Sequence, residues 1–140
     1  MSSCCESQSS RHPLKVHGCF DRGLRTRRLP ALPVSGTPIA TAYGLWACFS
    51  VRVENDTLAD LRFQASACTT LIAYCQALVE LSRHNTLAHA ETLNGPALIQ
   101  RLPGVPAVKH DRAVLASAAL KSAVATARST ITSTTGALVA

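Results

Sequence analysis

The fold is decided by residues 49–82, which read FSVRVENDTLADLRFQASACTTLIAYCQALVELS. Residues 49–54 alternate apolar and polar side chains, the period of a strand with one buried face. Asn55-Asp56 supplies turn residues, and residues 61–66 repeat the alternation. We therefore predict a β-hairpin with one apolar face.

From residue 69 the apolar positions recur with a helical period, which predicts a helix over Thr69–Arg83. A third strand is expected near Leu32–Thr37. Later helices are expected over Leu87–Thr92, Pro96–Arg101 and Ala113–Ala127. Strands followed by helices indicate an α+β fold, a small antiparallel sheet of about three strands with helices packed on one face. We expect one core to contain Phe49, Val51, Phe63, Leu71, Cys75, Leu78 and Leu115.

The length of 140 residues favours a single domain. Prolines and glycines predict an irregular arm over residues 1–37, followed by a domain over 38–128 and a flexible tail over 129–140. Residues 1–30 hold six Arg and Lys residues against two acidic ones, a net charge of +4 out of +6 for the chain. Such an arm suits an acidic partner, nucleic acid or an anionic membrane, but we favour a solvated tail.

The six cysteines form no C-x-x-C pair, and no secretory signal is visible. We therefore expect reduced thiols in the cytoplasm, although the Arg- and Ser-rich arm leaves organelle targeting open. No apolar run approaches the roughly 18 residues that span a bilayer. No nucleophile–base pair, phosphate-binding glycine loop or carboxylate pair is visible, so we do not expect an enzyme.

Three segments resemble the NifU/IscU-type iron–sulfur cluster scaffold family. RFQASACTTLIAYCQALVEL (62–81) is similar to its strand, Gly-Cys turn and long helix. NTLAHAETLNGPALIQRLPGVP (85–106) is similar to its connector, short helices and Leu-Pro loop, and AVLASAALKSAV (113–124) to its C-terminal helix. HPLKVHG (12–18) weakly resembles its opening Asn-Pro-Arg-Asn-Val-Gly. The resemblance implies a NifU/IscU-like fold that holds a transient iron–sulfur cluster, iron or zinc.

The family's ligands are three cysteines, an aspartate and a histidine, and the resemblance carries them over position by position. The Ala-Cys-Gly-Asp element falls on residues 42–45, where Tyr43 replaces the cysteine and Leu45 the aspartate. The second cysteine falls on Cys68, and the His-Cys pair on Asp111-Arg112. Cys68 and Asp111 are then the remaining candidate metal ligands, and all these positions should converge at one end of the sheet.

One thiolate and one carboxylate are fewer than the four ligands that a cluster or a structural zinc normally needs. The charge of Arg112 would also repel a metal cation. We therefore expect a divergent assembly scaffold in which cluster binding is weakened, lost, or shared across a homodimer through Cys68. The alternatives are a partner-binding module or decaying paralogue without cluster chemistry, and a small zinc domain with other ligands.

The remaining cysteines and histidines have simpler interpretations. Cys68 directly precedes a helix whose dipole favours a thiolate, which would suit a sulfur-accepting nucleophile. The alternative is a family relic without function, packed at the corner between strand and helix. We predict that Cys75 is a thiol in the core. Cys48 is expected to be half-exposed and without a functional role, or else to add a ligand to the site of another subunit. His84 should adopt a left-handed backbone, and His110 could turn toward the site. Cys4 and Cys5 are expected in the disordered arm.

The segment Val105-Pro106-Ala107-Val108-Lys109 resembles the Leu-Pro-Pro-Val-Lys peptide that the bacterial scaffold presents to its Hsp70-type chaperone. An extended apolar peptide held by a proline and carrying one cation suits the peptide-binding groove of a chaperone. An ordinary loop between helices is the alternative. The family's other implied partner is a cysteine desulfurase, whereas no membrane or nucleic-acid partner is expected.

Overall fold

The computed structural model describes residues 14–139, with side chains through residue 131. Cys4, Cys5, His12 and the rest of residues 1–13 of the predicted arm lie outside the described residues. The elements in order are α2 (Val16–Thr26), β1 (Val34–Ser35), β2 (Ile39–Ala40), β3 (Trp46–Glu54), β4 (Thr57–Ala65), α3 (Thr69–Ser82), α4 (Leu87–Glu91), α5 (Gly95–Arg101), the 3₁₀ turn η1 (Ala107–Lys109) and α6 (Asp111–Val139).

The predicted hairpin is confirmed. β3 and β4 pair in antiparallel register from Ala47–Ala65 to Glu54–Thr57, with one irregularity between Arg52 and Val53. The two residues that join them, Asn55 and Asp56, have φ values of 53° and 63°. Positive φ at both central positions is the geometry of the tight turn that matches the twist of paired strands.

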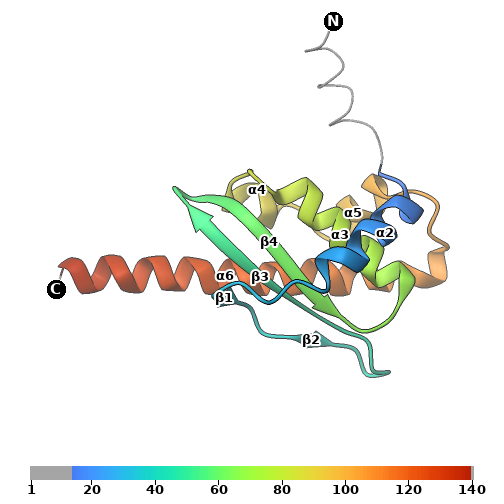
Figure 1. Ribbon diagram of the computed structural model, residues 1–140, viewed down its shortest axis with the longest axis horizontal. Helices are drawn as coiled ribbons and strands as arrows, with labels where there is room; N and C mark the ends of the chain where they lie inside the picture. Colours follow the sequence, from blue (N-terminus) through green and yellow to red (C-terminus); the bar gives the residue numbers. More distant parts are fainter. Residues whose placement is uncertain (1–13, 140) are drawn as a thin grey trace, which may run out of the picture.

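The short strands β1 and β2 both pair with the other edge of β3, which makes β3 the centre of a four-stranded sheet (Figure 1). β1 lies within the region where a third strand was expected, whereas β2 was not predicted. A two-residue strand is too short to have a period of its own, so its pairing depends on the neighbouring long strand.

Helices α3 and α6 pack on one face of the sheet, α3 against β4 and α6 against β3 (Figure 1). All seven predicted core residues are buried, and they belong to one cluster. In its centre the rings of Phe49 and Phe63 lie 5.8 Å apart, a favourable distance for tilted aromatic pairs. The predicted α+β architecture is therefore confirmed.

The expectation of an irregular segment through residue 37 is wrong for Val16–Thr26, which form α2 on top of α3. Gly23 was interpreted as a helix breaker, but it is a packing residue. A Cβ atom there would lie 2.7 Å from Cγ2 of Ile72, so only glycine permits this close contact. Arg22 also ties α2 to α3, since its Nη2 lies 2.9 Å from Oε1 of Glu80.

The C-terminal helix is longer than predicted, because α6 begins at Asp111 and continues to Val139. Residues 129–139, where a flexible tail was expected, thus continue this helix. Among the side chains described through residue 131, Ala127 is the last buried one of this helix, and Arg128 then forms two bonds of 2.8 and 2.9 Å to the carboxylate of Glu91. In the described part of the chain, no helix combines the length and apolar character needed to cross a membrane.

Candidate functional site

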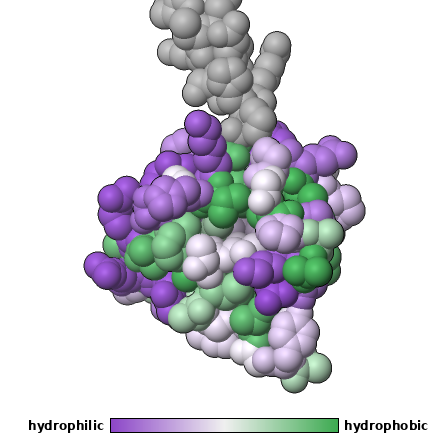
Figure 2. Space-filling view, turned by 90° about the vertical axis from the view of Figure 1, so that its right-hand side faces the viewer, coloured by the Kyte–Doolittle hydropathy of each residue, from purple (hydrophilic) through white to green (hydrophobic). Residues whose placement is uncertain are grey.

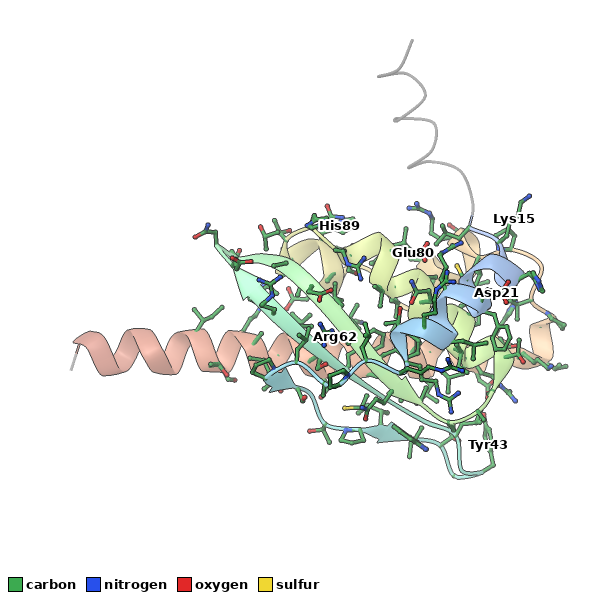
Figure 3. All side chains as sticks on the ribbon, viewed as in Figure 1. Lys15, Asp21, Tyr43, Arg62, Glu80 and His89 are labelled. Atoms are coloured by element: carbon green, nitrogen blue, oxygen red, sulfur yellow. The ribbon has the colours of Figure 1, made fainter. Side chains whose placement is uncertain are left out.

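A tight turn between β2 and β3 presents Tyr43 to solvent at one end of the sheet (Figure 3). The turn closes through a bond of 2.8 Å from the Thr41 N–H to the Leu45 carbonyl. Gly44 has a φ of +96°, a conformation that glycine adopts without strain. The ring of Tyr43 is 61% exposed, whereas Leu45 packs against the core.

Cys68 lies at the corner between β4 and α3, half-buried and in an extended conformation. It occupies the N-cap of α3, but its side chain makes no capping hydrogen bond. The N-terminus of a helix carries partial positive charge from its free N–H groups. The thiol therefore lies where a negatively charged sulfur would be stabilised.

Arg112, in the first turn of α6, connects these positions. Its Nη1 lies 2.6 Å from Oδ1 of Asp111, and its guanidinium carbon lies 5.9 Å from the centre of the Tyr43 ring. Hydrogen bonds with Asp111 and then with the Cys68 thiol raise the pKa of Arg112. Tyr43, Cys68 and Asp111-Arg112 thus converge, as the residue-by-residue resemblance implied.

This cluster, Tyr43–Cys68–Asp111–Arg112, is a poor metal site. It offers one thiol and one carboxylate, and the carboxylate is already paired with a guanidinium that has no lone pair to donate. Within residues 14–131, no group of three or more His, Cys, Asp or Glu side chains is arranged to hold a metal ion. The residues present therefore do not fit a four-ligand cluster or zinc site.

The other described thiols lie elsewhere. Cys75 is fully buried in the core, as predicted, and burial and then the nearby Cys68 raise its pKa. Cys19, beneath the Arg22–Glu80 pair, is also buried, and burial followed by the charge of Glu80 raises its pKa to about 11. Cys48 is half-buried, as predicted, and its Sγ lies 3.3 Å from the Gly36 carbonyl oxygen.

Two histidine predictions can be compared with the structure. His84 has a φ of 68°, which confirms the left-handed conformation at the end of α3. Its N–H donates to the Leu58 carbonyl at 2.7 Å, so the strained residue joins α3 to β4. His110 does not turn toward the Arg112 cluster, because its Nε2 lies 3.0 Å from the Val105 carbonyl oxygen.

The loop that resembles a chaperone-binding peptide, Val105–Lys109, is only partly extended. Pro106 has an extended backbone, but Ala107–Lys109 form a 3₁₀ turn closed by a bond of 2.9 Å from the Lys109 N–H to the Pro106 carbonyl. The expectation of a fully extended segment is therefore wrong. Val108 is 82% exposed at the tip, so the loop presents this large apolar side chain to solvent beside the exposed Pro106 and Ala107.

Comparisons with known proteins agree with the fold. The family model described as "NifU-like N terminal domain" matches residues 22–133. The nitrogen fixation proteins NifU of Nostoc sp. and Trichormus azollae are each 34% identical over 86 residues, 61% of this chain and 29% of each relative. The chain thus matches less than a third of the length of those proteins. The N-terminal part of a NifU-like protein from Brucella abortus superposes with a TM-score of 0.52 at 13% identity, over 69% of this chain and 81% of that one, a likeness of fold.

Proposed function

Since this chain belongs to the NifU-like N-terminal domain family, we propose that it is a divergent iron–sulfur cluster assembly scaffold whose own cluster or metal binding is weakened or lost. The proposal is supported most directly by Arg112, which stands where the resemblance expects a cysteine ligand. We further propose that the chain works without enzymatic chemistry, as a protein that contacts partners and carries the thiol of Cys68.

The electrostatic cost of a metal beside Arg112 is considerable. With an effective dielectric constant of about 20, two unit charges about 4 Å apart repel by about 4 kcal/mol, and a divalent ion doubles this. The Asp111 carboxylate, at 2.6 Å from the guanidinium, would first have to give up its ion pair. A single thiolate cannot offset both terms, so a stable cluster would need ligands from a second copy of the chain.

Restoring the ligands tests this proposal. The double variant Tyr43→Cys/Arg112→Cys removes the cation, releases Asp111 and adds two thiols to Cys68. Three thiolates and a carboxylate are a plausible four-coordinate set for zinc. We expect the double variant to bind one equivalent of zinc in a competitive titration, whereas the parent and the double variant carrying Cys68→Ser bind far more weakly.

A matched control adds two thiols elsewhere, at exposed Arg52 and Lys121. Arg52→Cys/Lys121→Cys should bind zinc no better than the parent. The same proteins are then reconstituted anaerobically with iron and sulfide, and their visible spectra are recorded together with their oligomeric state. A parent that binds one equivalent of zinc as a monomer would contradict the proposal.

A partner-binding module without cluster chemistry is the second candidate, and the exposure of Val108 on the Val105–Lys109 loop favours it. It is tested by the affinity of the full chain for an Hsp70-type chaperone and for a cysteine desulfurase. Val108→Asp should weaken chaperone binding, whereas Val114→Asp, at another exposed valine, should not. Retained partner binding with no cluster in any oligomeric form would favour this second function.

A further inference from the structure

A groove of about 230 Å³ lies between α2 and the corner that leads from β4 into α3. Its apolar wall is formed by Phe20 and Leu24 of α2 and by Ile72 of α3, and its rim by Ala67, Thr69 and Arg27. Cys68 stands between the two rim residues Ala67 and Thr69 in the chain. The Cys68 side chain does not itself line the groove, but its backbone joins the two rim residues, so the thiol is within reach of a flexible group on an occupant.

Three arginines stand in or just after the last turn of α2, and one of them, Arg27, lines the groove. Arg25, Arg27 and Arg28 have no ion-pair partner among residues 14–131. By contrast, six arginines each have a guanidinium nitrogen within 4.0 Å of a carboxylate oxygen: Arg22, Arg52, Arg62, Arg83, Arg112 and Arg128. Arg27 is held at the groove by a bond of 3.1 Å from its Nε to the Ala65 carbonyl oxygen.

A cation at the C-terminal end of a helix is stabilised by the helix dipole, which applies to Arg25 in the last turn and to Arg27 at the C-cap. The dipole does not account for the apolar groove beside these cations. Figure 2 views the end of the molecule that is on the right in Figure 1, where hydrophobic areas lie among strongly hydrophilic ones. Apolar anchors bordered by unpaired charges of one sign are typical of a surface that recognises an oppositely charged partner.

We propose that this groove docks an acidic peptide segment of a partner protein. One apolar side chain of the segment enters the groove between Phe20, Leu24 and Ile72, and flanking carboxylates pair with Arg25 and Arg28. The groove has one aromatic ring in its lining, Phe20, and no row of rings for stacking successive bases, so a peptide fits better than nucleic acid. The proposal does not rest on the proposed function, because it needs no metal and no cluster.

Peptide binding to the full chain tests the proposal. The probe is the fluorescein-labelled peptide EEFLEE, and its controls are EESGEE, which lacks the apolar anchor, and KKFLKK, which has the opposite charge. We expect the full chain to bind EEFLEE at least about tenfold more tightly than either control, as measured by fluorescence anisotropy. The affinity for EEFLEE should fall as salt is added. Equal binding of EESGEE and EEFLEE would overturn the proposal.

Variants locate the binding site. Arg25→Glu/Arg28→Glu reverses two exposed charges, and Ala67→Trp fills the groove from its exposed rim. Each should weaken EEFLEE binding by about tenfold or more. The matched control Arg52→Glu/Lys121→Glu makes the same change in net charge elsewhere and should alter the affinity by less than about twofold. Equal losses in the two charge-reversed proteins would overturn the proposal.

Proximity to Cys68 gives an independent readout. EEFLEE carrying a chloroacetyl group should alkylate Cys68 at least about tenfold faster than chloroacetyl-EESGEE does, as measured by mass spectrometry of the digested protein. Cys48, which lies in a different cavity with Leu29 and Ala31, should react with both peptides at the same rate. Preferential alkylation of Cys48, or competition by oligo-dT stronger than that by unlabelled EEFLEE, would overturn the proposal.

Discussion

Helices α3 and α5 begin in different ways. At the start of α5, the Asn94 side chain accepts a hydrogen bond of 3.0 Å from the Ala97 N–H, and Pro96 fills the first turn. At the start of α3, Cys68 occupies the same N-cap position and makes no such bond. The short helix has a conventional cap, and the long helix has a thiol where a cap would stabilise it.

The difference follows from what stabilises each helix. α5 has seven residues, two of them buried, so its ends contribute a large part of its stability. α3 has fourteen residues, most of them buried between the sheet, α2 and α6. Because packing stabilises α3 along its whole length, its first position is free to carry a chemically useful side chain.

The largest expected effect is in the body of α3. Leu78→Ala should destabilise the protein by about 2–5 kcal/mol, because it leaves a cavity at a fully buried position. Urea denaturation followed by circular dichroism measures the change. Gln100→Ala, at an exposed position of α5, is the control and should change stability by less than about 0.5 kcal/mol. A loss below about 1 kcal/mol for Leu78→Ala would mean that packing is not what holds α3.

The contact between α2 and α3 should be nearly as sensitive. Gly23→Ala places a methyl group 2.7 Å from Ile72 and should cost about 1–3 kcal/mol. Gly18→Ala in the same helix meets only the flexible end of Arg22, at 3.1 Å, and should raise stability by about 0.5–1 kcal/mol. Thermal unfolding of both variants checks the pair, and changes of the same sign would disprove the close approach of α2.

A smaller loss is expected at the cap of α5. Asn94→Ala removes the acceptor for the Ala97 N–H and should cost about 1 kcal/mol. Asn94→Asp keeps an acceptor and should be nearly neutral. If both variants lose the same amount in urea denaturation, the side-chain cap does not contribute to stability.

The smallest effect should have the opposite sign. Cys68→Ser supplies a capping oxygen to α3 and should raise stability by roughly 0.5 kcal/mol, whereas Cys68→Ala should give no gain. Chemical denaturation under reducing conditions compares the three proteins. A serine variant no more stable than the alanine variant would contradict the predicted cap.

The sequence predicted the elements that are long enough to show a repeating pattern of apolar residues. The hairpin and α3 each extend over many residues with one apolar face, and both are confirmed. The strand β2 has two residues and no period. The helix α2 was missed because Gly18 and Gly23 were interpreted as helix breakers, although a glycine also permits close helix packing.

The site was predictable only through resemblance. Tyr43, Cys68 and Arg112 lie on three different elements, and no local pattern connects them. Their convergence followed from positions carried over from the family, but the bond from Arg112 to Asp111 and the effect of Cys68 on the pKa of Arg112 required the structure. The groove between α2 and α3 could not be predicted, because one of its walls belongs to the helix that was missed.

The two-residue turn at Asn55-Asp56 has a consequence for folding kinetics. It joins the longest ladder of the sheet at almost no cost in loop-closure entropy, so the hairpin should form early and nucleate the remaining structure. The turn lies at the end of the hairpin opposite to the Tyr43 loop (Figure 1). Substitutions at positions 43, 45 and 112 should therefore leave the rate of this nucleation step unchanged, because they lie far from the turn that sets it.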